Sequence, residues 1–183
     1  TETVSKNTYD QELIDKFGIV KVKEATTEIT DSYNQDGSKV TWEHPQTITY
    51  GYSYEGGEAG RLLSIEDTGV GKVRTTDVFG NWTEQETINS YDQKLIDDFG
   101  IVRVKSSEST IIVNNIDGST SESKSVIWYT YTDGSETITD LTYVAETNRD
   151  KYFDKDGKCY VGLLKSANGT EDISGSDVFG VTY

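Results

Sequence analysis

The chain has 183 residues and a formal net charge of −15, because 32 acidic residues outnumber 17 Lys and Arg residues. This charge argues against nucleic acids and anionic membrane surfaces as partners, since both are bound mainly through Lys and Arg. Hydrophobic residues make up 33% and aromatic residues 11%, which predicts a folded protein with a thin core. No apolar stretch of the sequence approaches the roughly 18 residues of a transmembrane helix, so membrane insertion is not expected.

A long internal repeat dominates the sequence. Residues 9–23 are YDQELIDKFGIVKVK, and residues 91–105 are YDQKLIDDFGIVRVK. A second repeated block, Asp-Val-Phe-Gly, occurs at residues 77–80 and again at residues 177–180. Self-similarity at this period predicts two related units in tandem.

The predicted units are residues 1–82 and residues 83–183. No Pro/Gly/Ser-rich linker separates them, so we expect two units that pack together and do not swing freely. The second unit is longer, which we attribute to one extra hairpin between Ser119 and Gly157.

Each repeat block opens with a predicted helical turn. Asp10 and Asp92 are suited to cap its first turn, and Gly18 and Gly100 are suited to a left-handed stop. The apolar residues at helical spacing, which we expect to enter the core, are Leu13, Ile14 and Phe17.

The rest of the chain predicts antiparallel strands. Segments such as TITYGYSY and VIWYTYT alternate in polarity, and IVKVKEATTEIT and IVRVKSSESTIIV are rich in β-branched residues. Tight turns with two positive-φ residues each are expected at Asp36-Gly37, Asp117-Gly118, Asp133-Gly134, Asp156-Gly157 and Asn168-Gly169. The fold class is therefore all-β, with hairpins and meanders. In the Asp-Val-Phe-Gly blocks, we expect the aromatic residue to plug the base of each unit while the glycine turns the backbone.

Calcium is the one metal for which the sequence offers candidates. Asn34, Asp36 and Glu43 fall at positions of an EF-hand-type loop, but its first position is not Asp and its flanks predict strands. Asp154 and Asp156 form a similar partial set. Ordinary turns are the favoured interpretation of both segments, with loose Ca²⁺ binding as the alternative.

Aromatic residues offer a second kind of candidate site. Tyr50, Tyr52 and Tyr54 alternate along one strand face, and with Trp128 they are candidates for stacking on sugar rings. In thin sheets, such aromatic residues more often form the core itself.

Signs of catalysis are weak. His44 is the one histidine and Cys159 the one cysteine of the sequence, and neither lies in a recognisable nucleophile motif. We expect a surface histidine, a buried inert thiol and no enzymatic activity.

The pattern resembles repeats of very large bacterial surface and extracellular proteins. The residues that carry it are Asp77–Asn81, Tyr91, Phe99-Gly100, Arg103-Val104 and Asp117–Ser119. This resemblance implies an extracellular or cell-surface structural module, a stalk repeat or a filament subunit that assembles head-to-tail. The expected partners are copies of itself or neighbouring repeats, to which residues 1–9 would add a strand. The alternative is an adhesin module that binds surface glycans through its aromatic residues.

Overall fold

The computed structural model describes residues 3–69, 71–136, 153–154 and 156–183, and at residues 29, 42, 43, 68 and 69 it describes the backbone alone. Within these residues the strands are β1 (Thr3–Tyr9), β2 (Val22–Ile29), β3 (Ser32–Tyr33), β4 (Lys39–His44), β5 (Gln46–Tyr52), β6 (Leu62–Gly69), β7 (Gly71–Thr76), β8 (Trp82–Tyr91), β9 (Val104–Asn114), β10 (Thr120–Tyr131) and β11 (Leu164–Ser176). The helices are α1 (Gln11–Phe17), α2 (Gln93–Phe99) and the 3-10 turn η1 (Gly56–Glu58). The all-β prediction is confirmed.

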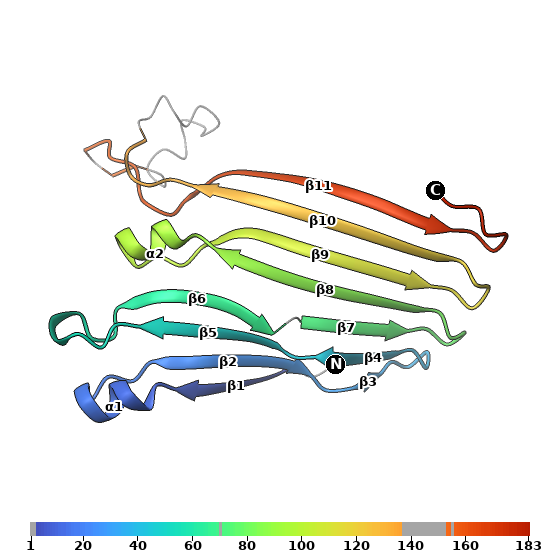
Figure 1. The fold of residues 1–183 in the computed structure, drawn as a ribbon, viewed down its shortest axis with the longest axis horizontal. Helices are drawn as coiled ribbons and strands as arrows, with labels where there is room; N and C mark the ends of the chain where they lie inside the picture. Colours follow the sequence, from blue (N-terminus) through green and yellow to red (C-terminus); the bar gives the residue numbers. More distant parts are fainter. Residues whose placement is uncertain (1–2, 70, 137–152, 155) are drawn as a thin grey trace.

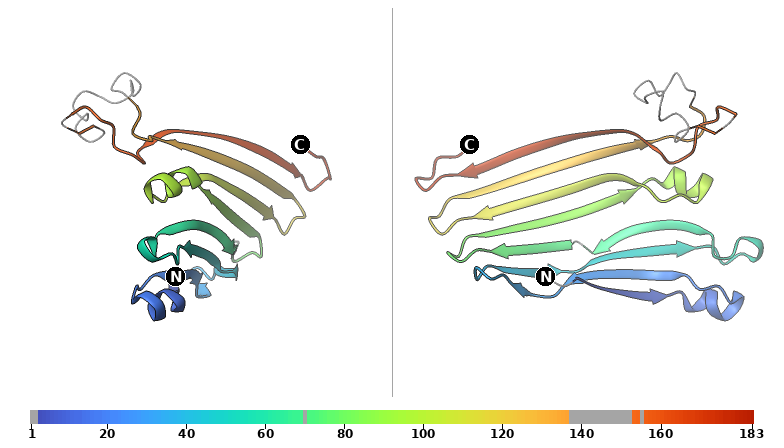
Figure 2. Two further views of the ribbon diagram at one scale, coloured as in Figure 1. Left: turned by 60° about the vertical axis from the view of Figure 1, so that its left-hand side comes forward. Right: turned by 180° about the vertical axis from the view of Figure 1, so that it is seen from behind.

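The described strands form two antiparallel sheets. One has the order β1-β2-β5-β6, and the other has the order β11-β10-β9-β8-β7-β4-β3. Figure 1 shows the strands side by side, with α1 and α2 at one end and hairpin turns at the other. In Figure 2 the same strands form a single curved and twisted layer. Residues of the inner strands are therefore mostly half-buried, and those of the edge strands β1 and β11 are mostly exposed.

The small core lies at the helix end of the layer. Among the described residues, the hydrophobic side chains that are buried are Leu13, Ile65, Leu95, Ile96, Phe153 and Cys159.

The predicted capping is confirmed: Asp10 and Asp92 accept from the backbone of residues 13 and 95, and Gly18 and Gly100 adopt left-handed conformations. The expectation for Phe17 is wrong, because this side chain is 36% exposed, as Phe99 is at 43%. The aromatic residue that ends each helix is therefore partly open to solvent and is not a core residue.

Most of the predicted turns are present, but their geometry differs from the expectation. Among the described residues, only glycines have positive φ, including Gly37, Gly118, Gly134 and Gly157. The preceding Asp does not. In three of these turns, its carboxylate instead accepts hydrogen bonds from the serine two residues later. Asp36, for example, accepts hydrogen bonds from the backbone N–H and the hydroxyl of Ser38 at 2.9 and 2.7 Å.

The predicted turn at Asn168-Gly169 is wrong. Both residues lie inside β11, opposite Trp128 and Ile127 of β10. A Cβ at Gly169 would lie 3.0 Å from the Val126 carbonyl oxygen, so glycine here permits close approach of two strands.

The aromatic residues of the Asp-Val-Phe-Gly blocks do not plug a core. Phe79 is 72% exposed and Phe179 is 88% exposed. In each turn the Asp side chain accepts from the Phe N–H at 2.8 Å, and the glycine that follows has a positive φ, as expected. This local bonding fixes the turn without burial and directs the ring outwards.

The two halves of the chain repeat one meander. The first half consists of β1, α1 and three interrupted strands. These correspond, in order and bonding, to β8, α2, β9, β10 and β11 of the second half. The Tyr52 hydroxyl donates to the Val22 carbonyl at 2.8 Å, and the Tyr131 hydroxyl donates to the Val104 carbonyl at the same distance.

The first half differs in the continuity of its strands. Its third strand is split between β4 and β5 at Pro45, which has no N–H to give to a neighbour. The corresponding strand in the second half, β10, is continuous. The predicted boundary after residue 82 falls at the first residue of β8. The expected extra hairpin falls largely in residues 137–152, outside the described residues.

Candidate functional site

The candidate metal ligands take part in the bonding of their own turns. The Asn34 amide donates to the Ser38 hydroxyl at 2.8 Å, and the Asp36 carboxylate accepts from Ser38 as above. The backbone N–H of Ser38 lowers the pKa of Asp36, and the Ser38 hydroxyl adds to this effect. The Glu43 side chain lies outside the described residues.

The second candidate segment has the same character. Asp154 accepts from the backbone N–H of Asp156 and of Lys158, each at 2.9 Å, while the Asp156 side chain is exposed. In the part of the chain that the structure describes, no three His, Cys, Asp or Glu residues form a group suited to a metal ion.

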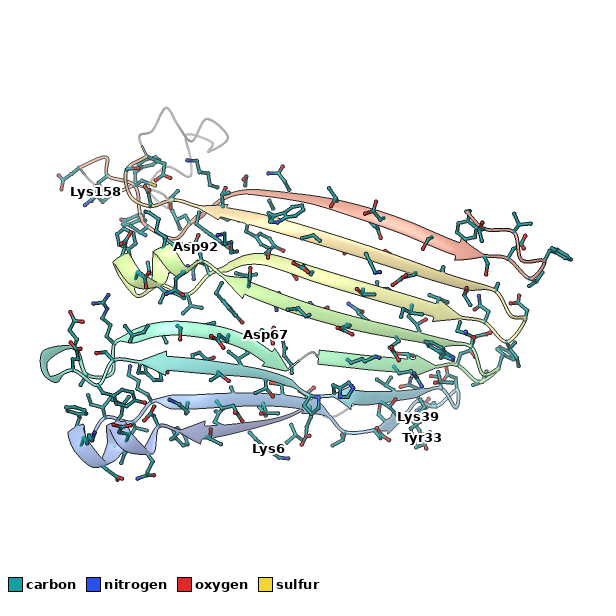
Figure 3. All side chains as sticks on the ribbon, in the orientation of Figure 1. Lys6, Tyr33, Lys39, Asp67, Asp92 and Lys158 are labelled. Carbon is teal, nitrogen blue, oxygen red and sulfur yellow. The ribbon has the colours of Figure 1, made fainter. Side chains whose placement is uncertain are left out.

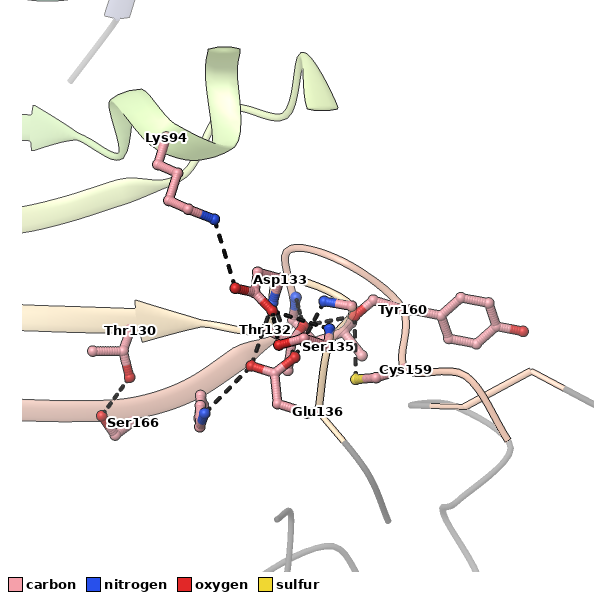
Figure 4. Close-up of polar contacts among 12 residues, drawn as sticks. Lys94, Thr130, Thr132, Asp133, Ser135, Glu136, Cys159, Tyr160 and Ser166 are labelled. Atoms are coloured by element: carbon pink, nitrogen blue, oxygen red, sulfur yellow. Dashed lines mark hydrogen bonds and ion pairs between the residues drawn. The ribbon is translucent and has the colours of Figure 1, made fainter. Parts of the chain in front are cut away.

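Another polar cluster lies directly after β10, around Glu136 (Figure 4). The Glu136 carboxylate accepts from the backbone N–H of Asp133 and of Gly134 at 3.0 and 3.1 Å, and Lys165 lies 3.3 Å from it. Cys159 is buried beside this cluster, and burial raises the pKa of its thiol. His44, in contrast, is exposed at the end of β4. The bonds of Glu136 thus link the residues directly after β10 to Lys165 of β11.

The structure distributes the candidate stacking residues over two sheets. The rings of Tyr50 and Tyr52 stack with centroids 6.5 Å apart, and Tyr54 donates to the Asp10 carboxylate at 2.6 Å. All three belong to the end of the β5 region that packs against α1 and β2. Trp128, 46% exposed, lies in β10 of the other sheet. Sugar binding by these residues stays a prediction.

A denser set of contacts lies at the junction between the halves, where β7 pairs with β8. The register places Arg74 opposite Glu84. Glu84 is 6% exposed, and each of its carboxylate oxygens contacts a cation: Lys72 Nζ at 2.5 Å and Arg74 Nη2 at 2.7 Å. The Arg74 guanidinium also lies 4.7 Å from the centroid of the Trp82 ring. Two cations of one half thus hold one buried carboxylate of the other.

These contacts determine the ionisation of Glu84. The hydrogen bond from Lys72 lowers the pKa of this carboxyl, burial opposes the shift, and Arg74 lowers it again. The net direction is downwards, so the glutamate is ionised at neutral pH and its charge is matched within the junction.

Further contacts cross the junction nearer the helices. Figure 3 shows Asp67 where the two sheets diverge; its Oδ2 accepts from the Asn89 N–H at 3.2 Å and from the Gln46 amide at 3.0 Å. The Gln93 amide of α2 donates to the Leu63 carbonyl at 2.7 Å. The helix thereby binds the exposed edge of β6 that β8 does not cover.

Sequence reasoning did not identify Lys72, Arg74 or Glu84 as functional residues. A signal was present, because two basic residues at positions 72 and 74 face two acidic residues at positions 84 and 86 across the turn at residues 77–81. Counting outwards from that turn gives Arg74 opposite Glu84, as observed, provided that the turn joins two paired strands. It gives Lys72 opposite Glu86, whereas Lys72 contacts Glu84 on the diagonal.

Comparisons with known proteins add no relatives. The chain matched no protein-family model, no curated protein and no solved structure. The described helices are also too short or too polar to span a bilayer.

Proposed function

We propose that this chain is a non-enzymatic structural repeat of an extracellular or cell-surface protein. Its units assemble head-to-tail into a stalk or filament, with copies of the chain or neighbouring repeats as partners. The observation that carries the proposal is the junction at β7 and β8, where the sheet of one unit continues into the next. Glu84, Lys72 and Arg74 join the units, because two cations of one unit contact a buried carboxylate of the other.

The shape of the molecule agrees with such a role. A one-layer sheet with a strand at each lateral edge extends by adding strands, since every edge strand offers free N–H and C=O groups. The second half repeats the first in strand order and in individual hydrogen bonds, so each unit has equivalent leading and trailing edges. The sequence resemblance to surface-protein repeats supports the same role and the extracellular location.

Immunogold labelling of the source cells, followed by negative-stain microscopy of the native material, tests the proposal. Antibodies against this chain should label elongated stalks or fibres at the cell surface. Label confined to the cell interior, or native material that consists of isolated compact particles at high concentration, would overturn it.

A further inference from the structure

The outer edge of β11 already carries the beginning of another strand. Gly175 and Tyr183 exchange backbone hydrogen bonds of 3.1 and 3.2 Å, and Ser176 pairs with Thr182. β7 and β8 begin in the same way, with Thr76 opposite Trp82 after the same Asp-Val-Phe-Gly turn. The edge of β11 is thus equivalent to the edge of β7 that receives β8.

The side chains at the two equivalent edges differ in charge. Counting back from the turn, Ser174 of β11 corresponds to Arg74 of β7, and Asp172 corresponds to Lys72. Among the described residues, Asp172 makes no ion pair but lies opposite Lys124 of β10. Ser174 lies opposite Glu122, whose carboxylate Lys124 Nζ contacts at 2.9 Å. Where the first edge offers two cations, the second offers two carboxylates, Asp172 and Glu122, with one cation, Lys124, beside them.

The next residue after Tyr183 in this register would face Ser174. A hollow of about 470 Å³ lies on this part of the sheet, lined by Glu122, Ser174 and Tyr183 among others. Because serine is small, a long side chain at the facing position has room to reach Glu122 through this hollow, and Asp172 lies two residues along the same edge. This is the environment of a Lys or Arg side chain.

We propose that the outer edge of β11 binds the opening strand of a neighbouring, non-identical repeat that carries Lys or Arg opposite Ser174. The inference rests on the proposed function, since it assumes that units join through their edge strands. An identical copy fits poorly. The residue that corresponds to Glu84 at the start of the chain is Glu2, so a second copy would place a third carboxylate beside Asp172 and Glu122, which already share Lys124. Junction chemistry would therefore determine the order of different repeats in an array.

Three fusion proteins test this. In each, a further copy of residues 84–183 follows Tyr183 of the full chain, so that Glu84 of the added copy faces Ser174. The first fusion is unmodified. The second carries Glu84→Lys in the added copy. The third keeps that glutamate and carries Ser174→Arg in the original β11, which supplies the cation that Arg74 provides at the natural junction.

Amide hydrogen exchange at Glu171 and Ile173 is the measurement. Gly175 exchanges both hydrogen bonds with Tyr183, so alternate residues along β11 direct their N–H groups to the same outer edge. We expect these two amides to exchange about three- to tenfold more slowly in the second and third fusions than in the first. Amides of the original β9, which lies between two strands in every fusion, serve as the internal control.

The outcomes separate the two proposals. Equal protection in all three fusions would overturn the charge requirement and leave edge-to-edge assembly intact. No protection in any fusion, with β9 still protected, would overturn both. Protection of the unmodified fusion alone would reverse the inference and favour identical copies.

Discussion

Hydrogen bonds from Lys72 and Arg74 lower the pKa of the Glu84 carboxyl, whereas burial raises it. The side chain is almost fully buried, while the side chains of Lys72 and Arg74 are 24% and 36% exposed. Replacing the carboxylate leaves two cations that solvent reaches only in part.

We expect Glu84→Gln to lower the free energy of unfolding by about 1–3 kcal/mol at neutral pH, less than for a fully buried pair. Urea denaturation measures this change. Glu86→Gln is the control: Glu86 lies on the same strand and face but makes no ion pair with a described residue, so a change below about 0.5 kcal/mol is expected. Equal losses in the two variants would contradict the role of the junction.

The same residue predicts a pH dependence. The pKa of Glu84 in the folded state is lowered below its ordinary value of 4.5, mainly by Lys72. Its contribution to stability is therefore fully present above about pH 4.5 and is lost as the pH falls through the folded pKa. The difference in unfolding free energy between the parent chain and Glu84→Gln should shrink below that pH. A difference that stays constant down to about pH 3 would show that the carboxylate charge is not involved.

Asp10 and Asp92 form a matched pair of caps. Each accepts from a backbone N–H of its helix, at 3.1 and 3.2 Å, but Asp10 also accepts from Tyr54 and pairs with Lys23. Losing the cap alone costs about 1 kcal/mol. Asp10→Ala should therefore lower the free energy of unfolding by more than Asp92→Ala, by roughly a further 1–2 kcal/mol. Thermal and urea unfolding compare the variants directly, and a larger loss for Asp92→Ala would contradict this assignment.

At the scale of elements, α1 and α2 have the same internal hydrogen bonds but differ in their contacts with neighbouring strands. Gln11 and Gln93 each donate to an aspartate four residues later at 2.7 Å. Gln93 alone of these two also reaches a strand of the other half, at Leu63. The helix of the second half is thus a docking element for the first.

This difference gives a further matched test. Gln93→Ala should lower the free energy of unfolding by about 1 kcal/mol more than Gln11→Ala, because it removes one additional hydrogen bond and exposes the edge of β6. Exchange of amides in β6, followed by NMR, should rise in Gln93→Ala and stay unchanged in Gln11→Ala. Similar behaviour of the two variants would argue against docking.

Some elements of the structure could be predicted from the sequence, and others could not. The two helices, their caps and the glycine turns at residues 37 and 118 were predicted, because each is held by hydrogen bonds among residues close in sequence. The outward position of Phe79 was missed, since an Asp-centred turn closes without any help from the aromatic ring.

At the scale of the whole molecule, the arrangement is one layer with few buried residues. A compact domain of this length has a radius of gyration of about 16 Å. We expect small-angle X-ray scattering to give a clearly larger value for the monomer and an elongated distance distribution (Figure 2). A value near that of a compact domain would contradict the one-layer arrangement in solution.

By itself, the sequence determined the strand-rich class, the tandem duplication, and the caps and glycine turns at which elements begin and end. These depend on alternation of polarity, on capping groups and on glycine conformations within a few residues. The tertiary structure alone decided that Asn168-Gly169 continues a strand and that Glu84 meets Lys72 and Arg74. Both outcomes depend on which strands become neighbours, and that choice is made by cross-strand hydrogen bonds and packing between segments far apart in the chain.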